Sequence, residues 1–339
     1  MAKTWRGLYS QVYAFDSLHA AYCRARRGKR HQAEVLRFEC DLEGELIQLQ
    51  NELIWDQYET GPYRAFWVAE PKRRLVAALP FRDRVLQHAL VSVLEPIWER
   101  EFIYHSYACR PGKGMHAGVD AAQRWMRSVQ REHGQAYALK LDVRQYFASV
   151  DHGVLLGLLA RRIRCPRTLA LCANILGSWS PGIPIGNLTS QLFANIYLHE
   201  LDRFAKQDLR VRHFARYMDD VLIVHHDKAH LHGLREQIER FLFDALALHA
   251  NGKTQVLPVG RLGNPALDWL GYRLWSTHRR LRSGGVRRMR RRLAWMQRAH
   301  ARGELSMGAV TARIRSWIGH AGHADSRRIR EQLLTPAIF

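Results

Sequence analysis

Two adjacent acids interrupt an apolar stretch of the chain, and this feature constrains the fold more than any other. The segment RYMDDVLIV, residues 216–224, places Asp219 and Asp220 between runs typical of β-strands. Removing one carboxylate from water costs several kcal/mol unless it is paired or bound to a cation. The run Val221–Val224 is typical of a strand buried on both faces. The pattern therefore predicts a hairpin that carries a metal site; the alternative is a hairpin whose acids face water.

A third acid has a matching setting. Asp142 in LKLDVRQYF follows an apolar strand and precedes a turn, although read alone it also fits a helix cap or a surface charge. Hard cations prefer oxygen ligands, and Mg²⁺ is held by a few carboxylates plus substrate phosphates. Two such ions about 3.5–4 Å apart hold the attacking and leaving oxygens of a phosphoryl transfer in line. The three acids in this order predict two-metal nucleotidyl transfer.

The charge of the chain points to a polyanionic partner. Its 339 residues carry 52 Lys and Arg against 31 Asp and Glu, a formal net charge of +21. Each neutralised phosphate releases counterions, so nucleic acid is the expected partner. No uncharged apolar run is long enough to span a bilayer, so we expect no membrane association.

The cysteines and the start of the chain bear on the compartment. The five cysteines are odd in number and include no CxxC, which favours reduced thiols over disulfides or a zinc site. The opening MAKTWRGLYSQVYAF lacks the apolar core of a signal peptide. We expect a cytoplasmic location.

Strand-like and helix-like segments alternate along the chain and predict an α+β fold, a sheet covered by helices. The first 60 residues are helical in pattern. Two β-rich runs within residues 61–81 flank a basic turn and predict a hairpin. From Arg279 onward the composition becomes strongly basic and helical, which indicates a separate lobe.

Three segments in order resemble the A, B and C motifs of reverse transcriptases: LDVRQYF, GIPIGNLTSQLFANIYL and RYMDD. The likeness continues through EPKRRLVAALPFRDRVLQHAL, SYACRPGKGMHAG and WLGYRLW, and covers roughly residues 1–325. Within the group II intron-like superfamily, IPIGNLTSQ and SYACRPGKG most resemble the reverse transcriptases of diversity-generating retroelements. The resemblance implies a right-hand polymerase fold: a helical extension over 1–60, fingers and an antiparallel-sheet palm over 61–275, and a basic α-helical thumb over 276–339.

The resemblance also implies roles around the metals. Asp142 and Asp219 would bind two Mg²⁺ ions, for which Mn²⁺ is a substitute, with Asp220 on the same hairpin and the carbonyl of Val143 as a further ligand. Lys253 of the Asn-Gly-Lys turn would lie near the leaving pyrophosphate as a proton donor. Without the family context, this segment is an ordinary turn.

Other residues would contact the incoming nucleotide. Lys72 and Arg74 of the basic hairpin would grip its triphosphate, since both side chains suit phosphate oxygens. Phe147 matches the steric gate, whose ring excludes a ribose 2′-OH. The alternatives are a solvated basic turn and an ordinary core aromatic.

Motif B departs from most of the superfamily, which has Gln-Gly after the loop proline. This chain has Ile185-Gly186, with Gln191 further on. Isoleucine forms no hydrogen bond, so the pocket is expected to discriminate base pairs less well. In the resembled subfamily this loop is tied to errors opposite template adenines, and we expect the same here. Gly186 would let the backbone approach the base pair closely.

Two further sets would grip nucleic acid. The primer-grip hairpin is expected at Trp269, Leu270, Gly271 and Tyr272, for which a core strand is the alternative. The template–primer duplex is expected to contact thumb arginines through its backbone, chiefly Arg287, Arg288, Arg291 and Arg292.

The sequence therefore predicts an RNA-directed DNA polymerase that copies a retroelement's template RNA into cDNA with adenine-directed errors. Its expected partners are template RNA, the cDNA or primer, dNTPs and a small basic accessory protein that forms a ring. Three alternatives remain: a reverse-transcriptase-like polymerase of an antiphage system, a maturase-like RNA-binding scaffold, and a two-metal nuclease. Intact acids disfavour the scaffold, and a nuclease would not need Phe147.

Overall fold

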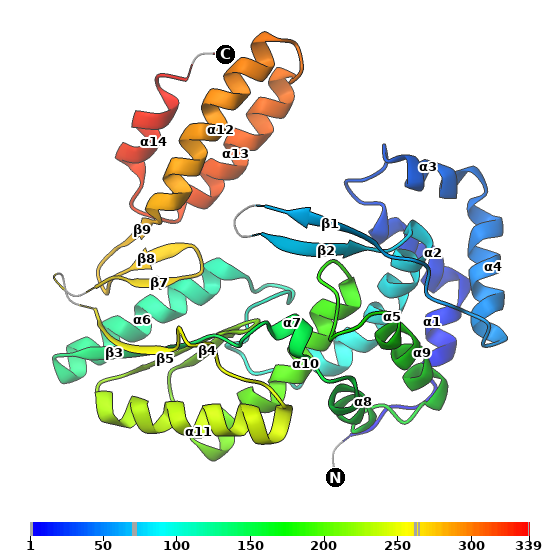
Figure 1. The fold of residues 1–339 in the computed structure, drawn as a ribbon, viewed down its shortest axis with the longest axis horizontal. Coiled ribbons are helices and arrows are strands. Elements are labelled where there is room, and N and C mark those ends of the chain that lie inside the picture. Colours follow the sequence, from blue (N-terminus) through cyan, green and yellow to red (C-terminus); the bar gives the residue numbers. More distant parts are fainter. Residues whose placement is uncertain (1–2, 70–72, 261–262, 264, 338) are drawn as a thin grey trace. The chain divides into compact units, whose positions relative to one another are not determined.

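A computed structural model describes residues 3–69, 73–260, 263, 265–337 and 339 (Figure 1). The chain divides into two compact units, each assembled from separate stretches of sequence. The first unit comprises Met1–Arg110, Asp142–Arg210 and Gln237–Gly252. The second comprises Pro111–Leu141, Val211–Glu236 and Lys253–Phe339. No helix in the described part of the chain is both long and apolar enough to cross a lipid bilayer.

The first unit is mainly helical. Helix α5 lies at its centre and packs against α1, α2, α3, α4 and α10. Buried side chains recur at helical spacing along α5, including Val85, Leu86, Ala89 and Leu90. The helices of this unit are α1 (Tyr9–Tyr13), α2 (Phe15–Ala25), α3 (Ala33–Cys40), α4 (Leu42–Ile54), α5 (Phe81–Glu99), α7 (Tyr146–Ser149), α8 (His152–Ala160), α9 (Pro166–Gly177), α10 (Leu188–Arg203) and a π-helix (Phe204–Asp208).

An antiparallel hairpin also belongs to the first unit. Strands β1 (Arg64–Val68) and β2 (Arg74–Ala78) pair from Arg64 opposite Ala78 to Val68 opposite Arg74. This confirms the hairpin predicted within residues 61–81. Every residue of β1 is exposed, whereas Ala77 of β2 is buried.

The second unit contains a four-stranded antiparallel sheet in the order β4-β5-β3-β6. Its strands are β3 (Ala136–Leu141), β4 (Phe214–Tyr217), β5 (Asp220–His225) and β6 (Gln255–Val259). Helix α6 (Met115–His133) packs against β3, β4 and β5. Helix α11 (Lys228–Leu246) begins in this unit and ends in the first. The four side chains of Val221–Val224 are at most 1% exposed, so the strand predicted to be buried on both faces is buried.

A second sheet and a helical bundle complete this unit. The sheet contains β7 (Leu267–Trp269), β8 (Tyr272–Leu274) and β9 (Arg279–Leu281) in that order. The bundle contains α12 (Ser283–Ala301), α13 (Met307–Gly322) and α14 (Arg327–Leu334) around a core that includes Met289, Leu293 and Met296. The predicted α+β class, with an antiparallel sheet covered by helices, is confirmed. The division at residues 60 and 275 stays a prediction.

Candidate active site

The acid pair sits at the tip of the β4–β5 hairpin in the second unit. Tyr217 pairs with Asp220, so Met218 and Asp219 form a two-residue turn. Met218 has φ 53°, a left-handed conformation that costs a residue with a Cβ of order 1–3 kcal/mol. Both acids are half-buried. The strained turn therefore places Asp219 between the two strands and Asp220 at the start of β5, at the end of the hairpin.

A buried arginine supports this turn. Arg216 is fully buried, and its guanidinium donates a hydrogen bond to the carbonyl of Met218 at 3.1 Å. Buried arginine is rare, so only its place three residues before the acid pair could have marked Arg216 as a functional residue.

Strand β3 runs beside the acid hairpin within the same sheet. Its last residue, Leu141, pairs with Val221, the residue that follows Asp220. The next residue in the chain is Asp142, the first residue of a stretch assigned to the first unit.

In the first unit, Asp142 is held by the first residue of the predicted Asn-Gly-Lys turn. The Asn251 side-chain amide donates to the Asp142 carboxylate at 3.2 Å, and the Asn251 backbone amide donates to the Asp142 carbonyl at 2.7 Å. Val143 forms an antiparallel bridge with Ala250. Asn251 is therefore a positioning residue that the sequence reasoning treated only as part of a turn. Lys253 lies in the turn just before β6 and is exposed.

Phe147 lies on the short helix α7 and is half-buried. The preceding residue, Tyr146, is buried and donates from its hydroxyl to the Ala194 carbonyl of α10 at 2.5 Å. The Phe147 carbonyl accepts a hydrogen bond from the Ile183 amide at 2.7 Å. Helix α7 is thus fixed on one side to α10 and on the other to the motif B loop.

The rest of the motif B loop contacts the β1–β2 hairpin. The Ile185 carbonyl accepts from the Ala77 amide at 2.8 Å. Gly186 has φ 132°, and a Cβ there would lie 2.3 Å from the Ala77 carbonyl oxygen. The Asn187 amide donates to the Tyr63 hydroxyl at 2.8 Å. The close contact with Ala77 therefore explains why a glycine is needed at position 186, independently of the predicted approach of a base pair.

The other residues predicted to contact the nucleotide also belong to the first unit. Arg74 opens β2 and is exposed, as a phosphate-gripping side chain must be. Lys72 lies outside the described residues. Gln191, on the first turn of α10, is exposed and lines a small hollow beside Cys109 and Arg110.

The predicted primer-grip residues form the β7–β8 hairpin of the second unit. Trp269 and Tyr272 are fully buried and pair across it, while Leu270 and Gly271 form the turn. Burial raises the pKa of Tyr272 to about 12. The Tyr272 hydroxyl donates to the His320 carbonyl of α13 at 2.8 Å. Trp269 and Tyr272 are therefore core side chains, which was the alternative to a primer-grip role. The half-buried turn Leu270–Gly271 joins them.

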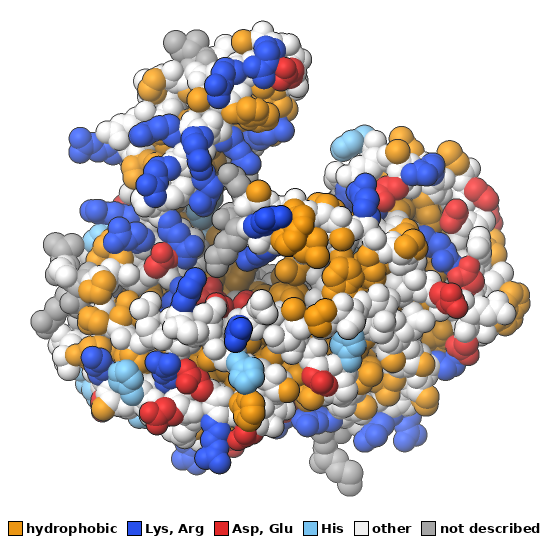
Figure 2. All heavy atoms as spheres, viewed as in Figure 1, with side chains coloured by type: hydrophobic (Ala, Val, Ile, Leu, Met, Phe, Trp, Pro, Cys, Tyr) orange, Lys and Arg blue, Asp and Glu red, His pale blue; other side chains and the backbone are white. Residues whose placement is uncertain are grey.

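The basic side chains of α12 lie opposite its buried face. A hollow of about 540 Å³ is lined by Gly284, Arg287, Arg288, Arg290 and Arg291. Figure 2 shows Lys and Arg side chains gathered over this bundle. Arg290 lines this hollow although it was not among the predicted thumb arginines, whereas the predicted Arg292 is exposed but does not line the hollow.

The acids offer only oxygen donors, which suits a hard divalent ion. Within the described residues, no group of three or more His, Cys, Asp and Glu side chains forms a preformed metal site. The half-buried pair Asp219 and Asp220 nevertheless fits an ion whose shell is completed by substrate phosphates and water, as magnesium sites commonly are.

The chain is 28% identical to protein YkfC of Escherichia coli K12 over 288 residues, covering 72% of this chain and 74% of YkfC. It is 31% identical to the group II intron-encoded protein LtrA of Lactococcus lactis over 164 residues, covering 44% of this chain but only 26% of LtrA.

Among solved structures, an apo telomerase of Candida tropicalis, truncated from its C-terminal domain, superimposes with a TM-score of 0.51 at 10% identity. The match covers 67% of this chain and 55% of the telomerase chain, and it shows the fold alone. The profile of the family "Reverse transcriptase (RNA-dependent DNA polymerase)" matches residues 69–274, more than half of the chain. The chain therefore belongs to the reverse transcriptase family of RNA-directed DNA polymerases.

Proposed function

We propose that this reverse transcriptase copies the template RNA of a retroelement into cDNA with errors at template adenines, using Asp142, Asp219 and Asp220 as its metal-binding acids. One observation carries the catalytic part of the proposal. Leu141 pairs with Val221, and each of these residues is bonded directly to one of the acids, Asp142 and Asp220.

Chain connectivity limits how far these acids can separate. Paired Cα atoms of antiparallel strands lie about 4.5–5.5 Å apart, and consecutive Cα atoms lie about 3.8 Å apart. Asp142 and Asp220 leave this pair toward the same end of the sheet, because the strands are antiparallel. These lengths support a shared site for the two carboxylates, with Asp219 one residue further along the turn.

When bound, two Mg²⁺ ions supply the charge neutralisation and in-line geometry that phosphoryl transfer requires. Asp142 and Asp219 would hold them, with Asp220 and the Val143 carbonyl nearby. Asn251 restrains the Asp142 carboxylate through its amide, and Arg216 fixes the turn that carries Asp219. The oxygen donors are thus held in place before a metal ion binds, so little conformational entropy is lost on binding.

The neighbouring residues define the nucleotide that reacts. Phe147 would exclude a ribose 2′-OH, and its backbone is held by the Ile183 amide, so the ring has a fixed support. Arg74, with Lys72, would hold the triphosphate, and Lys253 would lie near the departing pyrophosphate as a proton donor. Each role is supported by the matching motif position and, for Arg74 and Lys253, by exposure of the side chain.

The error-prone character rests on Ile185. A motif B side chain without hydrogen-bonding groups removes a polar contact that would reward correct geometry, so mispairs are rejected less strongly. The sequence likeness to diversity-generating retroelements supports adenine as the affected template base. That likeness also underlies the proposed ring-forming accessory protein, and the relative LtrA, a group II intron-encoded protein, supports a structured RNA as the template.

The test is extension of a DNA primer on a defined RNA template by the purified chain, followed by cDNA sequencing. Asp219→Asn combined with Asp220→Asn should reduce extension below about 1% of wild type, because the site loses metal-binding charge, while RNA affinity persists. Asp244→Asn, an exposed acid paired with Arg240 on α11, is the matched control and should extend normally. Retained synthesis in the double variant would remove the metal assignment.

The same experiment separates the alternatives. A maturase-like scaffold would bind RNA but make no cDNA even with the acids intact. An antiphage polymerase would make DNA without an excess of errors opposite adenine.

A further inference from the structure

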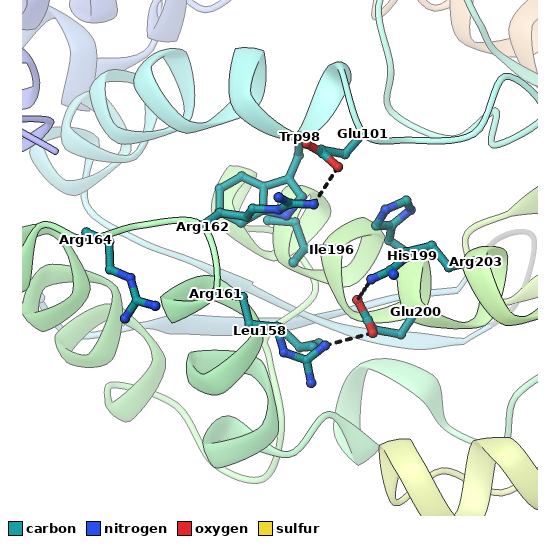
Figure 3. Close-up of a pocket in the computed structure, with 10 residues that line it drawn as sticks. All are labelled: Trp98, Glu101, Leu158, Arg161, Arg162, Arg164, Ile196, His199, Glu200 and Arg203. Carbon is teal, nitrogen blue, oxygen red and sulfur yellow. Dashed lines mark hydrogen bonds and ion pairs between the residues drawn. The ribbon is translucent and has the colours of Figure 1, made fainter. Parts of the chain in front are cut away.

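A hollow in the first unit, away from the motif B loop, is rimmed by arginines. It has a volume of about 350 Å³ and lies between the end of α5, the segment after α8 and the second half of α10 (Figure 3). Arg161, Arg162 and Arg164 come from the segment after α8, and Arg203 is the last residue of α10. Buried apolar side chains, chiefly Trp98, Leu158 and Ile196, form its floor.

The charges of this arginine hollow do not balance. Arg162 pairs with Glu101 at 2.7 Å. Glu200 serves two cations at once, Arg161 at 2.9 Å and Arg203 at 3.7 Å. Arg164 forms no ion pair among the described residues, and Figure 3 shows it apart from both carboxylates. Four guanidinium groups therefore face two carboxylates.

The segment that carries the three arginines is firmly held. The Trp5 amide donates to the Arg162 carbonyl at 2.8 Å, and the Arg164 amide donates to the Trp5 carbonyl at 2.7 Å. Two more cations stack on the Trp5 ring, Lys3 at 4.6 Å and Arg100 at 5.6 Å from its centroid. The positive patch thus extends beyond the hollow and rests on fixed backbone, which lowers the entropy cost of binding.

A second hollow continues the first. It has a volume of about 370 Å³, shares Leu158, Arg161 and Glu200 with the arginine hollow, and reaches Phe241 and Leu246. The result is a trough with cations along its rim and apolar side chains in its floor. Sites for single-stranded nucleic acid combine a cationic groove for the backbone with aromatic side chains for the bases, and Trp98 and Phe241 are aromatic residues that line this trough.

We propose that this trough binds the phosphodiester backbone of a single-stranded part of the template RNA, outside the template–primer duplex. The inference rests on the proposed function and adds a second RNA contact to it. Arg203 lies 13 residues beyond Ser190 on α10, so the arginine hollow lies about 20 Å along the helix from its motif B end. Arginine suits this role because its fork matches two phosphate oxygens.

The experiment compares RNA affinity in the full chain and the double variant Arg164→Ala/Arg203→Ala. Neither side chain has a role in the candidate active site. With a long single-stranded RNA extending beyond a primer, the variant should raise Kd about tenfold near 0.1 M salt and reduce the slope of log K against log salt by about 1.4, the value for two phosphates on a single strand. A short blunt primer–template should bind and be extended as by the wild type.

The matched control is Arg240→Ala, a nearby arginine of the same unit that is 84% exposed and lines neither hollow. It should leave both the affinity and the salt slope unchanged, and thermal melts of all variants establish folding. An equal loss in Arg240→Ala, or an unchanged slope in the double variant, overturns the proposal.

Two more arms identify the ligand. Long single-stranded DNA should compete through the same phosphates, whereas an acidic peptide should not; efficient displacement of RNA by poly-glutamate would reassign the trough to a protein partner and overturn the proposal. Because binding is measured without dNTPs, failure of this site is distinguishable from failure of the proposed polymerase activity.

Discussion

Replacing Gly182 by alanine would test whether motif B supports the predicted steric gate. Gly182 has φ 64°, and a Cβ there would lie 2.2 Å from the Phe147 carbonyl oxygen and 2.6 Å from the Ala148 carbonyl carbon. Both are backbone atoms, so no side-chain rotation relieves the overlap. The loop must move, and the 2.7 Å hydrogen bond from the Ile183 amide to the Phe147 carbonyl is the interaction that it strains first.

The cost has two parts. A left-handed alanine costs roughly 1–2 kcal/mol, and a buried hydrogen bond left unmade costs roughly 1–3 kcal/mol. A loss of about 3 kcal/mol lowers the Tm of a unit of this size by roughly 6–12 °C. Since Phe147 shares the displaced backbone, Gly182→Ala should also admit ribonucleotides more readily than the wild type.

The control is Gly157→Ala in α8, where an added Cβ meets no atom within 4 Å. It should melt no lower than the wild type, because alanine favours a helix interior by about 0.5–1 kcal/mol over glycine. The measurements are thermal melts and primer extension with matched dNTP and rNTP. If Gly182→Ala melts with the control and keeps the wild-type sugar selectivity, the loop does not support Phe147 as described.

Three further changes have distinct readouts. Phe147→Ala should raise the ratio of ribonucleotide to deoxyribonucleotide incorporation by at least about tenfold, and continued exclusion in single-nucleotide extension would place the gate elsewhere. Arg216→Met should cost about 1–3 kcal/mol in urea unfolding, because the Met218 carbonyl loses its buried donor; an unchanged midpoint would show that the turn needs no such support. Burial, reinforced by nearby cations, lowers the pKa of His88 to about 4, so the unfolded chain binds this proton more readily and stability falls as pH drops from about 6.5 toward about 4. For this half-exposed group the loss should be about 1–2 kcal/mol after screening, and melts at pH 7 and 4.5 should show a smaller drop for His88→Gln than for the wild type.

Local sequence patterns correctly predicted the strands in which apolar residues recur at regular spacing. Alternating and continuous apolar runs located the β1–β2 hairpin and the buried run Val221–Val224, because strand periodicity reports the environment of each residue. The order of the acids and the motif B loop then indicated the family. These inferences needed only short stretches of sequence.

Long-range partners were not accessible in this way. Asn251 and Asp142 form a hydrogen bond although they are 109 residues apart in the sequence. Nothing in the sequence around either residue indicates this contact. Arginine is ordinarily exposed, yet Arg216 is fully buried within strand β4. The charge imbalance of the arginine hollow could not be predicted either, because its cations come from the segment after α8 and from α10, and their carboxylate partners are identified only once the chain has folded.

The motif B loop is held at two points four residues apart, and this makes Ile185 unusually informative. Gly182 fits against the Phe147 carbonyl, while Gly186 fits against the Ala77 carbonyl. The backbone of Ile185 is fixed between them by the Ala77 amide at 2.8 Å. A substitution there therefore changes the side chain with little freedom to shift the loop.

Ile185→Gln should for this reason isolate the polar contact that the pocket lacks. A glutamine amide that bonds only in correct pairing geometry adds roughly 1–2 kcal/mol of discrimination, or about 5–30-fold fewer errors opposite template adenine. Ile185→Leu keeps the side chain apolar and should retain the wild-type error spectrum in cDNA sequencing. Equal spectra for the glutamine and leucine variants would show that selectivity is set by backbone placement, at the two glycine contacts, and not by the motif B side chain.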